Sequence, residues 1–512
     1  MEHNELDPKV HQVYGENESI PSRPEVRRTI DKVLSDIGFG RFQLELLILM
    51  GGSVACDSME ICLIGFLQGC VKEIWNLSGR MEALLAAAVF VGQVIGMLGA
   101  PLADTYGRRP LILTGWVLIV VFGFSSVVAP NYWVLVSLRA VVGVGIGLSQ
   151  TTSYDMVTEM LAKEDRSKVT YSNLMSALGG LYMLIVAWTL LNEYGWRILT
   201  LFCAFPILII AVWGFFFLPE SPRWLVAQGR TEDAENVLEN IAVYNDVKKE
   251  VGVIRLIKTP VDIESCGICE MFSSDIVDVT WKLWIVWFFV YFTYYCMFLA
   301  LMLFLESPNN NCSYNYLHIM YAGLAETSLI IIAILVVDWS GRCLSQLVFF
   351  GCAAVFGIAF SIMNAYAFNR ADTTIMIIAG KSFVVGGLCI MWVHCAELFP
   401  TELRATGHSS TNIVGRIGAV FATFWIDAVT ARHLLLGGIF FSCVILVAAM
   451  FAYALPETGG KSLDRIVGFS GDESSSVCSD FERDFHFSPS RTSTSSAKQE
   501  ELDGLLERHQ KQ

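Results

Sequence analysis

Two carboxylates lie three residues apart within an apolar stretch near the start of the sequence, Asp57 and Glu60. On a helix this spacing places both side chains on one face. A charged group at the centre of a bilayer costs on the order of 3 kcal/mol on insertion scales, so an ionisable pair there indicates a function by default. Close carboxylates also disfavour double ionisation, which would suit a proton carrier. The alternative is a structural pair satisfied by Tyr or Arg on another helix.

Further polar side chains interrupt the apolar stretches later in the chain. We expect Glu326 and Lys381 at similar depth, where they could simply neutralise each other. Arg416 lies deeper and could bind an anionic substrate or pair with either early carboxylate. Aromatic residues could stack on a planar or cationic ligand, although they more often serve packing, and His394 fits a packed histidine or a proton relay. The candidates for substrate binding or proton coupling are Asp57, Glu60, Glu326, Lys381, Arg416, Asn412, Tyr291, Tyr294 and Trp392.

The elements that must position these residues are membrane-length helices. The 512 residues are 54% hydrophobic and only 16% charged, and the mean hydropathy of +0.52 exceeds what a soluble domain tolerates. Twelve apolar stretches are long enough to cross a bilayer. They fall near residues 44–67, 81–103, 110–129, 132–158, 171–191, 198–218, 281–305, 316–337, 344–367, 373–396, 409–428 and 434–455.

This spacing predicts an all-α membrane protein with two six-helix halves. We expect an N-terminal tail over 1–43, the first half over 44–218, a central loop over 219–280, the second half over 281–455 and a disordered tail over 456–512. Basic residues concentrate in the loops that share a side with both tails, so both termini are predicted to be cytoplasmic.

That topology places two glycosylation sequons, at Asn76 and Asn311, on the extracytoplasmic side. The C-terminal tail carries an acidic dileucine pattern that endocytic sorting adaptors could bind, although such short patterns also occur by chance. Its residues are Glu501, Leu505 and Leu506.

Other site types find little support in the sequence. The fourteen cysteines are scattered and most resemble small buried hydrophobes, so a disulfide framework is not expected. Gly143-Val-Gly-Ile-Gly147 lies inside an apolar stretch, where it indicates close helix packing rather than dinucleotide binding. Neither a Walker motif, a Ser-His-Asp order nor a metal cluster is evident, so we predict no enzyme activity, no cofactor and no metal. The net charge of −14 does not indicate a nucleic-acid partner.

Two polar turns, one in each half, repeat an Asp-x-x-Gly-Arg pattern between apolar stretches. The first turn contains Asp104, Gly107, Arg108 and Arg109, and the second runs from Asp338 through Gly341 to Arg342. A short charged turn between membrane-length helices must lie at the water interface. The glycine permits a tight turn, and the arginines can pair with acids on a neighbouring helix.

These turns, together with several other motifs, resemble the major facilitator superfamily, in particular its sugar-porter and organic-ion branches. The motifs include Pro219-Glu-Ser-Pro-Arg223 and Pro456-Glu-Thr458. The resemblance implies cytoplasmic gate networks in which Glu159 pairs with Arg109 and Glu397 with Arg342. The implied gate residues are Asp104, Gly107, Arg108, Arg109, Arg139, Glu159, Arg166, Asp338, Gly341, Arg342, Glu397 and Arg404.

Within this superfamily, Asp36-Ile-Gly-Phe-Gly-Arg-Phe-Gln43 and Cys56-Asp-Ser-Met-Glu60 look most similar to the synaptic vesicle 2-related proteins, whose relatives include organic cation and anion transporters. The resemblance implies a secondary transporter that moves a small organic ion by alternating access, in the plasma membrane or an endosomal or secretory vesicle membrane, with proton coupling an open option. Two alternatives are a vesicle protein that binds a ligand or partners without net transport, and a hexose or polyol porter.

Overall fold

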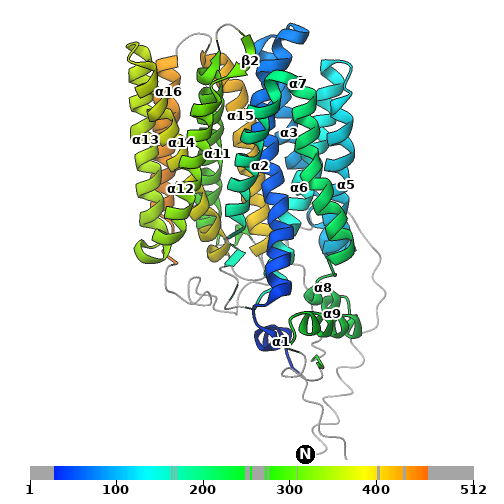
Figure 1. Cartoon of the computed structure of the whole chain (residues 1–512). Coiled ribbons are helices and arrows are strands. Elements are labelled where there is room, and N and C mark those ends of the chain that lie inside the picture. Colours follow the sequence, from blue (N-terminus) through cyan, green and yellow to red (C-terminus); the bar gives the residue numbers. More distant parts are fainter. Residues whose placement is uncertain are drawn as a thin grey trace, which may run out of the picture. The chain divides into compact units, whose positions relative to one another are not determined.

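The computed structural model describes residues 28–162, 165, 168–169, 171–247, 254–256, 271–273, 276–307, 310–399, 404–430 and 434–458, nearly all of them in helices (Figure 1). The first half consists of five long helices, α2 (Arg41–Trp75), α3 (Gly79–Leu98), α5 (Arg108–Val127), α6 (Tyr132–Met160) and α7 (Ser172–Phe217), with the short α4 (Leu102–Tyr106) between α3 and α5. The second half consists of α11 (Val277–Leu305), α12 (Tyr316–Ser340), α13 (Arg342–Ala365), α14 (Arg370–Leu398), α15 (Arg404–Thr430) and α16 (Leu434–Tyr453).

The twelve predicted spans correspond to eleven long helices, because α7 contains two of them. Its backbone leaves the helical region at Gly195, where φ is +73°, and the Tyr182 hydroxyl donates to the carbonyl of Phe202 at 3.0 Å, so the two arms lie side by side. Ten of the described helices are long and apolar enough to cross a membrane. α15 is not among them, because it carries buried polar side chains that include Thr411, Asn412 and Arg416.

The outer surface of the bundle is apolar. Phe216, Leu335 and Val355 are 82%, 71% and 65% exposed, and many other large hydrophobic side chains are also accessible. In water such a surface would drive aggregation, whereas in lipid it is the expected solvent-facing side. The surface therefore agrees with a multi-pass membrane protein.

Glycines allow the closest helix contact in the first half. A Cβ atom on Gly92 of α3 would collide with the carbonyl of Ala140 on α6, and one on Gly147 would collide with the carbonyl of Gln93. This confirms that the glycines of residues 143–147 serve helix packing.

The most extensive helix packing between the halves, within the described residues, occurs at three pairs of helices. α3 packs against α15, α7 against α12, and α2 against α11. Side chains on these helices can therefore meet across the interface between the halves.

Short elements mark the two ends of the bundle. Figure 1 shows α1 (Ile30–Ile37), α8 (Pro222–Ala227) and α9 (Thr231–Tyr244) at one end, which we call the α9 end. At the other, the β-hairpin end, β1 (Glu306–Ser307) pairs antiparallel with β2 (Asn310–Tyr314). The central loop is thus partly helical, and α1 packs on α9.

Candidate functional site

The centre of the interface is an ion pair between the halves. Asp57 on α2 accepts from Arg416 on α15 at 2.6 Å, and the two residues are only 7% and 1% exposed. Gln93 on α3 donates to the second Asp57 oxygen at 2.7 Å. Arg416 also donates to the Tyr295 hydroxyl at 2.8 Å and to the side-chain carbonyl of Gln150 at 3.2 Å. The cluster therefore draws on five helices, two of them from the second half.

Glu60 has a different partner although it lies one turn from Asp57. Both of its oxygens accept from Arg139 on α6 at 2.9 Å, and Arg139 also donates to Ser126 and to the carbonyl of Gly123. All of these residues belong to the first half. The two carboxylates thus do not act on each other as one pair, since each is compensated by its own arginine.

The placement of Arg139 corrects the sequence interpretation. Arg139 lies in the part of α6 nearest the β-hairpin end, whereas Glu159 lies near the last turn at the α9 end. Arg139 therefore contributes to the buried Glu60 pair and not to the charged turns.

Glu326 on α12 and Lys381 on α14 form the predicted ion pair within the second half. The Lys381 ammonium also lies 5.6 Å from the centroid of the Tyr294 ring. Both charged residues line a cavity of about 70 Å³ that Ser58 and Cys62 of α2 complete from the first half. Glu326 and Lys381 thus neutralise each other, and their pair lies beside the interface between the two halves.

An aromatic layer lies next to Arg416, on its α9 side. The Tyr291 ring lies 5.4 Å from the Arg416 guanidinium and stacks on Trp287. Trp392 of α14 stacks on Tyr154 of α6, with centroids 5.1 Å apart and planes at 22°, so this contact also crosses between the halves. Stacked rings of this kind contribute about 1 kcal/mol beyond their burial.

Some central residues were missed by the sequence interpretation. Gln93, Gln150 and Tyr154 are buried or half-buried polar groups inside apolar helices. The criterion that singled out Asp57, a polar side chain in a spanning segment, applies to them as well.

The predicted candidate Asn412 is 1% exposed, and its side-chain oxygen has no hydrogen-bond partner among the described residues.

The first charged turn forms what we call the N-turn cluster: Asp104, Arg108, Glu159 and Glu220. Arg108 pairs with Asp104 at 2.8 Å and with Glu159 at 3.0 Å, and Gly107 makes the turn with φ of +101°. The expected partner of Glu159 was Arg109, which is wrong, because Arg109 instead donates to the carbonyl of Phe215. α5 begins at Arg108, so neighbouring side chains project about 100° apart on the helix.

The C-turn cluster consists of Arg342, Glu397 and Glu457. Arg342 donates to both oxygens of Glu397, at 2.9 and 3.0 Å, which confirms that predicted pair. Gly341 has φ of +81° and makes the turn as Gly107 does. His394 lies beside this cluster and contacts the Gln346 side chain at 2.8 Å and the Pro456 carbonyl at 3.0 Å, which fits a packed histidine.

Each cluster also contains a glutamate that caps a helix. Glu220 accepts from the backbone N–H groups of Arg108 and Arg109 at 2.9 and 3.3 Å. Glu457 accepts from those of Arg342 and Cys343 at 2.8 and 2.9 Å. The first N–H groups of a helix have no partner within it and attract negative charge. The Pro-Glu-Ser and Pro-Glu-Thr motifs thus supply a carboxylate to the start of α5 and of α13.

Several predicted residues have no described contacts. Arg166 and the tail residues Glu501, Leu505 and Leu506 lie outside the described residues, and the side chains of Asp338, Arg404 and Asn311 are also not described. Asn76 ends α2 in the left-handed region, with φ of +46°, and is exposed.

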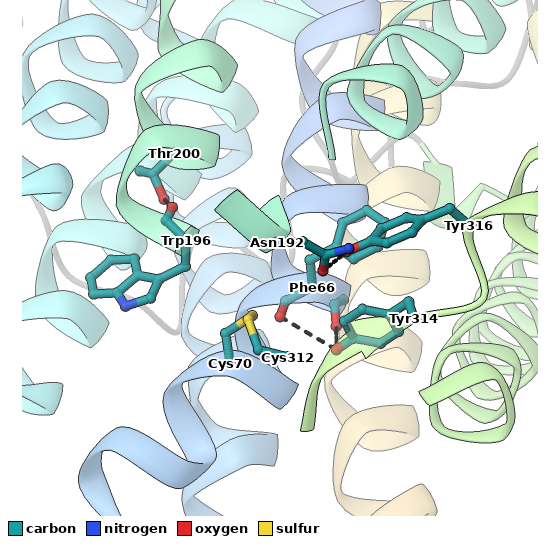
Figure 2. Close-up of a disulfide and its surroundings, with 9 residues drawn as sticks. Phe66, Cys70, Asn192, Trp196, Thr200, Cys312, Tyr314 and Tyr316 are labelled. Carbon is teal, nitrogen blue, oxygen red and sulfur yellow. Dashed lines mark hydrogen bonds between the residues drawn. A yellow bond between two sulfur atoms is a disulfide. The ribbon is translucent and has the colours of Figure 1, made fainter. Parts of the chain in front are cut away.

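A disulfide at the β-hairpin end corrects the expectation for the cysteines. Cys70 in the last turns of α2 is bonded to Cys312 on β2, 242 residues later (Figure 2). The sequence offered no sign of this pairing, because the two cysteines belong to different halves and neither lies in a repeated motif.

Comparisons with known proteins agree with this architecture. The family model described as sugar (and other) transporter matches residues 72–467. The Caenorhabditis elegans protein named putative transporter svop-1 is 28% identical over 458 residues, which cover 85% of this chain and 86% of that protein. The Arabidopsis thaliana organic cation/carnitine transporter 7 is 26% identical over 486 residues, with 85% and 96% coverage. The synaptic vesicle 2-related protein of Rattus norvegicus is 28% identical over 455 residues, with 85% and 82% coverage.

Solved structures show the same fold. The major facilitator superfamily proton:xylose symporter XylE bound to 6-bromo-6-deoxy-D-glucose has a TM-score of 0.67 and 20% identity, and the match covers 84% of this chain and 98% of that one. The partially occluded inward-open form of XylE from E. coli has a TM-score of 0.65 and 19% identity, with coverage of 84% and 100%. The two six-helix halves, the charged turn of each half and the matched family model together show that the chain belongs to the sugar (and other) transporter family of the major facilitator superfamily.

Proposed function

We propose that this protein moves a small organic ion across its membrane by alternating access, and that the Asp57–Arg416 ion pair is the contact that substrate or a proton must break. One observation carries the proposal. A buried ion pair at 2.6 Å joins α2 of one half to α15 of the other. The halves cannot separate at the centre while this pair is intact.

The environment of the pair indicates how it would be broken. Removing one partner of a buried ion pair leaves an uncompensated charge and costs about 3–5 kcal/mol. A ligand that supplies the missing charge offsets that cost: a cation could replace Arg416 at Asp57, an anion could replace Asp57 at Arg416, and a proton could neutralise Asp57. After separation, Tyr295 would still accept from Arg416 and Gln93 would still donate to Asp57, because each of these pairs lies within one half. The bond from Arg416 to Gln150 crosses between the halves and would break together with the ion pair.

The aromatic layer would form the next barrier on the α9 side. Tyr154 and Trp392 come from different halves and stack on each other. Opening toward the α9 end would separate these rings and expose Arg416 and Tyr291, whose aromatic face could hold a planar or cationic substrate.

We infer the topology and the location from the two ends of the bundle. We place the α9 end, with the N-turn and C-turn clusters, in the cytoplasm. Disulfides persist in oxidising compartments, so the Cys70–Cys312 bond favours an extracytoplasmic β-hairpin end, which would also expose Asn76 to glycosylation. The named synaptic vesicle 2-related relatives favour a vesicle membrane. Sorting adaptors that bind residues 501–506 would fit that location, and the plasma membrane is the alternative.

The substrate class is proposed from the charge of the site. A relative is named organic cation/carnitine transporter, and the structural neighbours are xylose transporters. A neutral sugar could not replace either partner of the central ion pair, so we favour an organic ion and keep a hexose or polyol as the second candidate.

The test is uptake by purified protein in liposomes. Organic cations, carboxylates such as nicotinate, and hexoses are offered with and without an inward proton gradient, to wild type and to Asp57→Asn. We expect one charged class to be taken up, and its uptake to be lost in Asp57→Asn. Glu326→Gln is the matched control, because its ion pair lies within one half.

Two results would contradict the proposal. Uptake of hexoses alone, unaffected by Asp57→Asn, would favour the sugar porter. Absence of uptake by folded protein, combined with saturable binding of a panel member, would favour a vesicle protein that binds without transport.

A further inference from the structure

The Cys70–Cys312 disulfide joins the two halves covalently at the β-hairpin end. Cys70 belongs to α2, the first span of the first half, whereas Cys312 lies on β2, between the first and second spans of the second half. Figure 2 shows the bond between the end of the α2 helix and the strand that leads to Tyr314 and Tyr316. Apart from the chain itself, it is the one covalent link between the halves within the described residues.

Other contacts fix the β-hairpin to the first half. The Tyr314 hydroxyl donates to the carbonyls of Gly65 and Phe66 at 3.4 Å. Burial raises the pKa of Tyr314, so this hydroxyl keeps its proton and can donate. The Tyr316 hydroxyl donates to the side-chain oxygen of Asn192 on α7 at 2.9 Å. A segment of the second half is thus held on α2 and α7 of the first.

The β-hairpin forms part of the wall of a cavity at the interface between the halves. This cavity of about 120 Å³ is lined by Gln68, Lys72 and Glu82 from the first half and by Met302, Tyr314 and Asp427 from the second. Its walls come from both halves, so they must separate when this end opens. Cys70 and Tyr314 connect the same two walls.

We propose that the Cys70–Cys312 disulfide is a redox-controlled latch that limits how far the interface opens at the β-hairpin end. The proposal rests on the alternating access proposed above. A dithiol that reaches Cys312 attacks one sulfur and breaks the bond; it donates two electrons and two protons in total and leaves as its own disulfide. Cys70 and Cys312 are then thiols, and the β-hairpin is held to α2 by non-covalent contacts alone, among them the Tyr314 hydrogen bonds and the packing of the Tyr314 ring on Phe66.

The first test asks whether the halves are linked. A protease site is inserted into residues 257–270, between the halves, and the cut protein is separated by denaturing electrophoresis without reductant. We expect one band at full mass that splits into two with dithiothreitol. Cys312→Ser should give two bands in either condition, and Cys443→Ser, which removes an exposed free cysteine, should behave as wild type. Two bands from unreduced wild type would overturn the latch.

The second test asks whether the link restrains opening. Spin labels are attached through a ketone-bearing unnatural amino acid at Val128 and Tyr366, which lie on different halves at the β-hairpin end and are 77% and 74% exposed. We expect reduction to add a population at longer distance, and the Cys70→Ser/Cys312→Ser variant to show that population without reductant. Identical distances in oxidised and reduced wild type would overturn the proposal.

These readouts need no substrate. A latch that opens on reduction in a protein that takes up no panel member would count against the proposed transport, and not against the latch. Uptake of substrate with unchanged distances would count against the latch alone.

Discussion

The two turn clusters and the central ion pair use the same chemistry in opposite ways. In the N-turn cluster Arg108 pairs with Glu159, and in the C-turn cluster Arg342 pairs with Glu397, so each pair stays within one half. Asp57 and Arg416 instead come from different halves. Pairs within a half can persist while the halves move as rigid bodies, whereas the pair between them must separate. The comparison assigns stability to the turn clusters and conformational change to the centre.

The largest expected effect is at Arg416. Arg416→Gln should lower uptake at least tenfold, because it removes the charge that holds Asp57 and also the donor to Tyr295. Arg416→Lys should not restore uptake, since one ammonium cannot reproduce the planar donor geometry. The measurement is the initial rate of uptake into liposomes, normalised to the amount of folded protein. Uptake by Arg416→Lys at the wild-type rate would show that the planar donor geometry of Arg416 is not required.

Glu60 should affect stability more than transport. Glu60→Gln leaves the buried Arg139 without a counter-charge and should lower the free energy of unfolding by about 3 kcal/mol. Unfolding in detergent mixtures measures the loss. Uptake per folded molecule should stay near the wild-type rate, because the pair lies within one half. A complete loss of uptake with unchanged stability would reverse the roles given to the two early carboxylates.

The two capping glutamates should have equal, smaller effects. Glu220→Gln and Glu457→Gln each remove a negative charge from a helix N-terminus, which should cost about 1 kcal/mol. The partners described for Glu220 and for Glu457 lie in different halves, so the double variant should show the sum of the two losses. The same unfolding assay tests this. A large loss for one glutamate and none for the other would contradict the equivalence of the two clusters.

The smallest effect should be at Arg109. Arg109→Gln removes a half-buried donor to one backbone carbonyl, so stability should change by less than about 0.5 kcal/mol. Arg108→Gln, the adjacent change, removes two ion pairs and should cost more. If Arg109→Gln proved the more damaging of the two, the pairing of Arg108 with Glu159 would be wrong.

Features that depend on neighbouring residues could be predicted from the sequence, whereas contacts between distant residues mostly could not. Apolar stretches and glycine turns are local, and they correctly gave the helices, the two halves and the turns at Gly107 and Gly341. Pairings that depend on the relative rotation of helices were less accessible. Arg108 and Arg109 are adjacent in sequence but project in different directions, and the sequence around Arg139 does not identify Glu60 as its partner.

The disulfide and the central pair depend on how the halves meet. Cys70 and Cys312 are 242 residues apart, and neither sequence neighbourhood indicates the other. Asp57 and Arg416 could be proposed as partners because both are charges in spanning segments, but Glu60 was an equal candidate. The packing of α15 against α3, next to α2, brings Arg416 to Asp57, whereas the packing of α2 against α6 places Glu60 beside Arg139.

The most direct test of the central claim compares distances between the halves in wild type, Asp57→Asn and Glu60→Gln. Spin labels at the same two positions, Val128 and Tyr366, and a second pair at the α9 end would report both entrances. If the Asp57–Arg416 pair holds the halves together, Asp57→Asn should add populations at longer distance, and Glu60→Gln should leave the distances unchanged. Distances that are the same in wild type and Asp57→Asn at both ends would contradict the account.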